Sequence, residues 1–444
     1  MAFENLAYRV DRAGFGQALV HLNKARLVVR EASEEPGSEG YLRPPAYQRE
    51  AIRELRGIFT RGWDELRASQ DSLDRAELTS DVRGLLRRTR PQDYRTSHMV
   101  LLPHLGIAYG AVTREGLESL QGLGDNINAI HLLPDDLELI QPQGQTAQPL
   151  AAQQNVDWGL VTMCIPQLWA MGYKGKNVKI AHLDTGIDSL HPAMTGTVGQ
   201  AMFFKKSSGA KQSITGPFKD TDGHGTNTGG ILVAAQNGMP QTVSVAPEAT
   251  LISGIVIEGG KVSKRVVNGL EWVKGKGARV LSLSVGFSKY TDDFVDLFQE
   301  LRNLGILPVV GIGNTGGQTC SPGNYPTALS VGATNYSNMV AWESGYALPG
   351  QKGIGPLCCA PGANVRTAKD GGGYELQTGS SMAAPHVAGL AALLFQARPS
   401  ATIDQVQQAI LLSCKNPKNE PAMKIGAGIP CAPDALAELI KMVP

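Results

Sequence analysis

The chain has 444 residues, of which 42% are hydrophobic and 18% charged, so it has a globular composition and length enough for two or three domains. Its 41 Lys and Arg residues balance 40 Asp and Glu residues, so the overall charge gives no electrostatic case for binding to nucleic acid or an acidic membrane surface. The sequence has no uncharged apolar run of about 18 residues, so it predicts no membrane-spanning helix. The N-terminus lacks a basic stretch followed by an apolar run, so we expect no signal peptide and a cytoplasmic protein, or one exported without a leader.

The first third of the chain is predicted as a helix-rich region followed by a small α+β unit. In chain order, the hydrophobic spacing predicts helices over 46–69 and about 74–88, a strand over 97–112, a helix over 113–121 and a strand over 127–141. We divide this part into an extension (1–95), a strand–helix–strand unit (96–142) and a Gln/Pro/Ala-rich linker (143–154).

The remaining residues, 155–444, alternate short apolar strands with helices. The predicted elements are strands over 177–186, 249–257, 278–286 and 306–314, and helices over 227–236, 263–274 and 290–304. Such alternation indicates an α/β fold, a mostly parallel sheet with helices on both faces. In these folds the reactive groups gather at the carboxyl ends of the strands.

Three residues in this part have side chains suited to catalysis. Asp184 ends an apolar strand, His224 lies between glycines in DTDGHGTNTGG, and Ser381 begins a long apolar helix. Each has a plain structural explanation when it is taken alone: an acid in a turn, a histidine in a turn or cap, and a serine that caps a helix.

The three residues together resemble the subtilisin family of serine peptidases. Their order, Asp, His, Ser, is the subtilisin order, and the flanking motifs DTGIDSLHP, HGT and GSSMAAPHVAG also match. Further matches are VAPEATL, LSLSVG, GIGNTGG, SPGNYPTALSVGAT and GAGIPCAPDAL, so the resemblance covers about 151–440. Asn227 and Ser380 depart from the family's usual His and Thr, and neither change removes a triad group.

The resemblance implies a catalytic triad and an oxyanion hole. Ser381 is expected to attack the peptide carbonyl, His224 to accept and return its proton, and Asp184 to hold the imidazole. Asn314, in GIGNTGG, matches the family's side-chain oxyanion donor, with the backbone N–H of Ser381 as its partner.

Substrate contacts are also implied by the resemblance. Ser284, Val285 and Gly286 match the strand that pairs with an extended substrate. The specificity pocket would have a wall that includes Gly311 and Gly313, with Cys320 near its base. A cysteine there would admit a medium or large apolar side chain; the alternative is a buried structural thiol.

No cofactor is expected. Ala193 stands where family members often place an Asp that binds structural calcium, and calcium needs carboxylate ligands. The six cysteines lack metal-binding spacing; they are either free thiols or include a Cys414–Cys431 bridge.

Residues 97–142 resemble the second half of a subtilisin prodomain, which would inhibit the peptidase and be removed by self-cleavage in the linker. The leading hypothesis is therefore an α/β serine endopeptidase made as an autoinhibited precursor, with extended polypeptide as substrate and its own N-terminal domain as inhibitor. Two alternatives stay open: a processing peptidase for one peptide or leader, and a catalytically silent peptide-binding protein.

Overall fold

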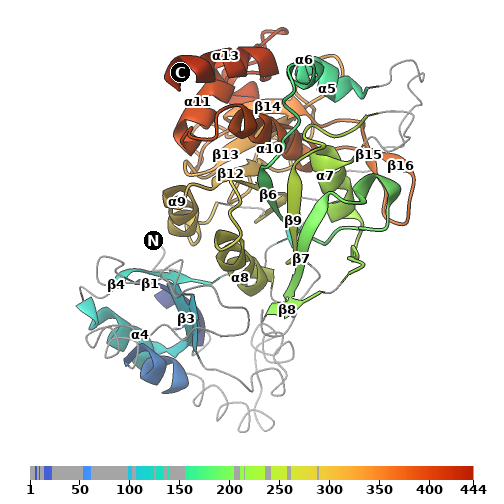
Figure 1. Ribbon diagram of the computed structural model, residues 1–444. Helices are drawn as coiled ribbons and strands as arrows, with labels where there is room; N and C mark the ends of the chain where they lie inside the picture. The colour runs from blue at the N-terminus through green and yellow to red at the C-terminus, as the bar shows by residue number, and fades with distance from the viewer. Residues whose placement is uncertain are drawn as a thin grey trace. The chain divides into compact units, whose positions relative to one another are not determined.

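A computed structural model describes residues 6–7, 10, 15–22, 54–61, 99–102, 107–124, 127–133, 138–139, 156–204, 211–214, 216–235, 242–257, 262–287 and 290–443. These residues form two compact units, Met1–Asp135 and Asp136–Pro444 (Figure 1). Residues 54–61 are helical, within the helix predicted over 46–69. The helix predicted over 74–88 and the linker 143–154 lie outside the described residues.

The first unit contains a four-stranded antiparallel sheet. Its strands are β1 (Phe15–Leu22), β2 (Met99–Leu102), β3 (Ile107–Thr113) and β4 (Ile127–Leu132), in the order β2-β3-β1-β4. Helix α4 (Arg114–Gln121) follows β3, and the side chain of Thr113 accepts a hydrogen bond from the Gly116 N–H at its start. The predicted strand over 97–112 is two strands, and sequence analysis missed β1, which lies between β3 and β4.

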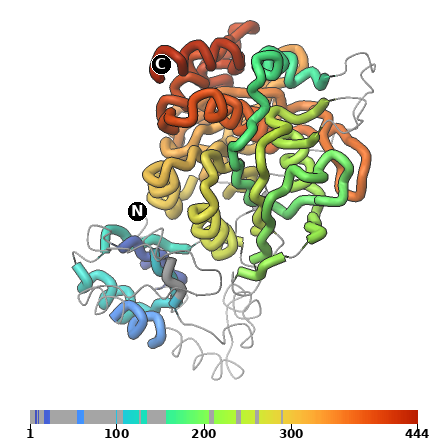
Figure 2. The backbone as a smooth tube through the Cα atoms, in the orientation of Figure 1, coloured from blue at the N-terminus to red at the C-terminus, as the bar shows by residue number. Residues whose placement is uncertain are grey.

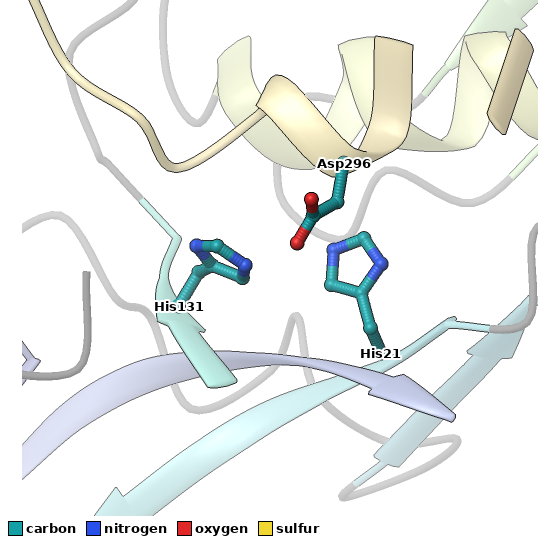
Figure 3. Close-up of side chains that lie close together, drawn as sticks. All are labelled: His21, His131 and Asp296. Carbon is teal, nitrogen blue, oxygen red and sulfur yellow. The ribbon is translucent and has the colours of Figure 1, made fainter. Parts of the chain in front are cut away.

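Two buried histidines lie side by side on this sheet. The register pairs Leu19 with His131 and His21 with Ala129, so the imidazoles of His21 and His131 are diagonal neighbours. Their ring centroids are 5.2 Å apart in an edge-to-face arrangement (Figure 3). The third residue labelled in that figure, Asp296, lies in the first turn of helix α9 (Val295–Asn303) of the second unit.

The second unit is built on an eight-stranded sheet. Its strands are β6 (Lys179–Asp184), β7 (Val198–Phe204), β8 (Lys211–Ser213), β9 (Thr250–Ile255), β10 (Val280–Leu283), β12 (Leu307–Gly311), β13 (Leu329–Thr334) and β14 (Cys358–Pro361). The order is β14-β13-β12-β10-β6-β9-β7-β8, and every neighbouring pair is parallel except β7–β8 at one edge. The predicted α/β fold is confirmed.

Helices cover both faces of this sheet. Alternate residues of a strand point to opposite faces, so neighbouring residues of β6 contact helices of different layers. On β6, His182 contacts Thr228 of α7 (His224–Val233), whereas a Cβ on Gly269 of α8 (Val262–Lys274) would touch Leu183. Helix α10 (Ser380–Ala397) packs beside α7, and α9 (Val295–Asn303) lies on the face of α8 (Figure 1). The sheet therefore lies between two helical layers.

Shorter elements complete the second unit. They are α5 (Trp158–Thr162), α6 (Ile165–Ala170), the 3-10 turn η4 (Pro192–Met194), α11 (Ile403–Leu412), α12 (Ala422–Ile425) and α13 (Ala432–Met442), with the paired strands β5 (Glu138–Leu139) and β11 (Val285–Gly286), and β15 (Val365–Ala368) and β16 (Tyr374–Gln377). Helices α10, α11 and α13, orange to red, pack against one another (Figure 2). None of the described helices has the length and hydropathy to cross a bilayer.

All six cysteines are described, and none forms a disulfide. Cys431 Sγ lies 3.1 Å from Cys164 Sγ, across the junction between α5–α6 and α13. Cys414 instead lies beside Cys358, whose pKa it helps to raise. The Cys414–Cys431 alternative is therefore not supported, because the fold brings a different thiol to Cys431.

Oxidised glutathione is expected to convert the Cys164–Cys431 pair to a disulfide, because thiols this close need little backbone movement. Joining residues 267 apart would restrict the unfolded chain and raise Tm by about 5–10 °C. Calorimetry with and without oxidation measures this shift, and Cys164→Ser is the control. A titration that still finds six free thiols after oxidation would contradict the expectation.

Candidate active site

Asp184 and His224 are hydrogen-bonded at the carboxyl end of the central strand β6. Asp184 is the last residue of β6, and His224 is the first residue of α7. His224 Nδ1 lies 2.8 Å from Asp184 Oδ1, and both side chains are buried. Asp184 Oδ1 also accepts the Thr185 N–H at 2.7 Å. The carboxylate thus fixes the orientation of the imidazole and the Nδ1–H tautomer.

Two glycines allow the turns that carry these residues to meet. Gly223, immediately before His224, has a φ of 100°, which favours glycine. A Cβ on Gly225 would lie 2.1 Å from the carbonyl oxygen of Gly186 in the turn after Asp184. Glycine is therefore required where the two turns come into contact.

Sequence analysis missed Asp220, whose carboxylate connects these turns by hydrogen bonds. Its Oδ1 accepts the Thr185 hydroxyl at 2.7 Å, and its Oδ2 accepts the N–H of Thr226 at 2.6 Å. The signal was the acid that begins DTDGHGT, four residues before His224. Asp220 thereby joins the turn after β6 to the first turn of α7.

The pKa values of Asp184 and His224 are shifted in opposite directions. Burial alone would raise the pKa of Asp184, but the charge and hydrogen bond of His224 outweigh it and lower that pKa. Burial alone would lower the pKa of His224, but the carboxylate of Asp184 raises it above its ordinary value of 6.5. Asp184 therefore stays ionised while His224 exchanges a proton. His224 Nε2 has no hydrogen-bond partner among the described residues, which leaves that atom for proton transfer.

Ser381 lies in the first turn of α10, after Gly379, whose φ is 153°. The Ser380 N–H donates to Asn314 Oδ1 at 2.7 Å, and Ser284 Oγ donates to the Ser381 carbonyl at 3.2 Å. The hydrogen bond from the Ser380 N–H to Oδ1 orients the Asn314 amide group, and its Nδ2 lies close to Gly379. The fold thus brings Asn314 and Ser284 to the predicted nucleophile, and α10 packs on the helix that begins with His224.

Two of the three residues expected to bind an extended substrate are paired with a strand of the protein itself. Val285 and Gly286, strand β11, form an antiparallel pair with Leu139 and Glu138, strand β5 of the same unit. The residues just before the predicted linker therefore lie along the edge strand expected to pair with substrate.

The predicted wall and base of the specificity pocket are also adjacent. A Cβ on Gly313 would lie 2.5 Å from Cys320 Sγ, and a Cβ on Gly311 would lie 3.1 Å from the Ser380 carbonyl oxygen. Cys320 is buried. Gly311 and Gly313 thus allow close approach of Cys320 and of the turn that carries Ser381.

Two departures from the family pattern have structural explanations. Asn227 Nδ2 donates to the Ala368 carbonyl and to Glu375 Oε1, both at 2.8 Å, which links α7 to the β15–β16 hairpin. Ala193 is fully buried in an apolar cluster with Ala234 and Val243. The side chains of Ala234 and Val243 carry no oxygen atom that could replace the carboxylate that Ala193 lacks.

The chain is similar to known peptidases over this region. The profile of the Subtilase family (Peptidase S8) matches residues 175–428, more than half of the chain. Subtilisin E of Bacillus subtilis (strain 168) is 33% identical over 264 residues, which cover 58% of this chain and 65% of subtilisin E. Subtilisin of Bacillus pumilus is 32% identical over 264 residues, 58% of this chain and 90% of that protein.

M-protease of Shouchella clausii (strain KSM-K16) is 33% identical over 282 residues, which cover 61% of this chain and 70% of that protein. The chain therefore belongs to the subtilase family, as its motifs predicted.

Proposed function

We propose that this protein is a serine endopeptidase that hydrolyses extended polypeptides through an acyl-enzyme. The observation that carries the proposal is the buried Asp184–His224 hydrogen bond of 2.8 Å, beside a helix that presents Ser381 in its first turn. A lone serine hydroxyl is a weak nucleophile at neutral pH, so it needs a positioned base.

The residues support a two-stage reaction. As Ser381 Oγ bonds to the substrate carbonyl carbon, its proton moves to His224 Nε2, and Asp184 stabilises the imidazolium. Asn314 Nδ2 and the Ser381 N–H would stabilise the oxyanion. His224 then gives the proton to the leaving amine as the C–N bond breaks, and water removes the acyl group by the same steps.

We propose in addition that the protein is made as an autoinhibited precursor. The pairing of β5 with β11 supports this, because β5 would block any substrate strand at the same edge. The antiparallel register runs from Gly286 opposite Glu138 to Val285 opposite Leu139, and so towards Ser284 and Ser381. The bonds to test first are therefore those that follow Leu139, between it and the predicted linker at 143–154.

A fluorophosphonate probe tests both proposals when intact mass is followed over time. The wild type is expected to be labelled at Ser381 and to lose a fragment that ends between Leu139 and the predicted linker. Ser381→Ala should show neither change, whereas Ser380→Ala, the neighbouring control, should retain the label. Labelling without fragment loss would keep the enzyme and make the N-terminal unit a permanent domain.

The alternatives make different predictions in the same assay. Absence of labelling, even after limited proteolysis before residue 150, would favour a peptide-binding protein. Labelling without cleavage of unstructured proteins would favour a peptidase for one peptide or leader. The formal net charge of +1 gives no electrostatic reason to expect nucleic acid as a ligand. The apolar surroundings of Ala193 support the proposal that no calcium binds there.

A further inference from the structure

A second buried imidazole lies behind the carboxylate of the proposed triad. His182 is two residues before Asp184 on β6, so both side chains project from the same face of the sheet. His182 is 1% exposed, and its Nε2 lies 3.7 Å from Asp184 Oδ2. The proposed mechanism uses only the other oxygen, Oδ1, to hold His224.

Both ring nitrogens of His182 contact a hydroxyl group. Nδ1 lies 3.1 Å from Ser253 Oγ on β9, and Nε2 lies 2.8 Å from Thr228 Oγ1 on α7. The same Thr228 Oγ1 lies 3.2 Å from Asp184 Oδ2. A continuous series of contacts thus runs from Ser253 through His182 and Thr228 to the carboxylate.

The chemistry of these groups limits which of them donates and which accepts in each hydrogen bond of the series. A threonine hydroxyl has one hydrogen, and Thr228 is also 3.2 Å from the carbonyl oxygens of His224 and Gly225. An ionised carboxylate is the strongest of these acceptors. If His182 Nε2 carries the proton, it donates to Thr228 Oγ1, and the hydroxyl hydrogen is free for Asp184. If Nδ1 carries it, Nε2 competes with Asp184 for that hydrogen.

The surroundings of His182 favour the neutral form of its imidazole. Burial lowers its pKa; the charges of Asp184 and Asp220 act in the opposite sense, and that of His224 in the same sense. The ring is therefore neutral, with one donor and one acceptor nitrogen. Its acceptor Nδ1 would receive the Ser253 hydroxyl.

We propose that His182 is a positioning residue for the triad, holding Thr228 through an Nε2–H donor so that Thr228 donates to Asp184 Oδ2 and leaves Oδ1 for His224. This inference rests on the proposed peptidase function. With hydrogen bonds at both oxygens the carboxylate cannot rotate away from His224. The N–H and O–H dipoles of this series also have their positive ends directed toward the triad, which disfavours protonation of His224.

The test compares His182→Leu, which removes the donor, with His182→Gln, which can place an amide N–H near the position of Nε2. Active sites are counted with the fluorophosphonate probe, so unfolded protein is not scored as slow enzyme. His182→Leu is expected to lower kcat about tenfold with KM nearly unchanged, and His182→Gln to recover most of the loss. The acidic limb of kcat/KM should move to higher pH by about 0.3 or more in His182→Leu. Equal values for the two variants, or an unmoved limb, would overturn the inference.

Thr228→Val supplies the matched double-mutant cycle. Because it removes the link to Asp184, adding His182→Leu to it should cause little further loss. Losses that multiply in the double variant would mean that His182 does not act through Thr228.

A readout independent of activity separates this inference from the proposed function. In Ser381→Ala, nitrogen-15 spectra of the histidines at neutral pH should show His182 protonated at Nε2 alone. An Nδ1–H or doubly protonated ring would overturn the inference even if the protein is a peptidase. If the wild type proves inactive, the function fails, while the tautomer result still decides whether the hydrogen-bond series exists.

Discussion

Ser381→Ala is expected to lower kcat by about 10⁶, and His224→Ala by a similar factor, magnitudes carried over from measurements on subtilisin itself. The physical reason is that the hydroxyl and the imidazole act as one unit. Without the base the serine is not activated, and without the serine the base has no proton to accept. Initial rates on a chromogenic peptide measure the loss, after residues before about 150 are removed equally from every variant.

The double variant is the control for this prediction. If Ser381 and His224 form one unit, removing both costs no more than removing one. Losses that multiply would contradict the triad. The pH dependence gives a second check: His224 must be neutral to act as a base, and Asp184 raises its pKa above 6.5. The wild-type kcat/KM should therefore rise with pH through a value above 6.5.

Asn314→Ala is expected to lower kcat by about 10²–10³ with little change in KM, the effect known for the side-chain oxyanion donor of subtilisin and carried over from it. The amide would bond to the oxyanion only in the transition state, so its loss affects turnover rather than binding. Steady-state kinetics on the same peptide measures both parameters.

Asn314→Asp is the matched variant for this prediction. It keeps the Oδ1 acceptor that the Ser380 N–H needs, and it replaces the donor with a negative charge. Its loss of kcat should be at least as great as that of Asn314→Ala, whereas its Tm should stay close to the wild-type value. An unchanged kcat in Asn314→Ala would remove this residue from the oxyanion hole. A loss that appears only in Asn314→Ala, accompanied by a lower Tm, would mean that Asn314 merely supports α10.

The parallel fold could be predicted from the sequence because each of its main elements carries its own signal. Strands β6, β9, β10 and β12 are buried on both faces and therefore appear as nearly continuous apolar runs. The first unit was harder to predict. Strand β1 was missed because it lies more than 80 residues before β3, and its pairing depends on contacts that no local pattern reveals.

The cysteines show the same limit at the level of single side chains. Cys414 and Cys431 are close in sequence, yet Cys431 lies beside Cys164, 267 residues away. The packing of α13 against α6 decides the neighbour, and spacing along the chain carries no information about that contact.

The family and the candidate triad could be predicted from short motifs, because Asp184, His224 and Ser381 each lie in a motif whose order and neighbours are local features of the chain. Which groups surround the triad depends on the assembled fold. His182 reads as one more residue of an apolar strand until parallel pairing with β9 brings Ser253 to one nitrogen and packing of α7 brings Thr228 to the other. Such contacts join residues 46 and 71 positions apart, so they form only when the sheet and its helical layer are assembled.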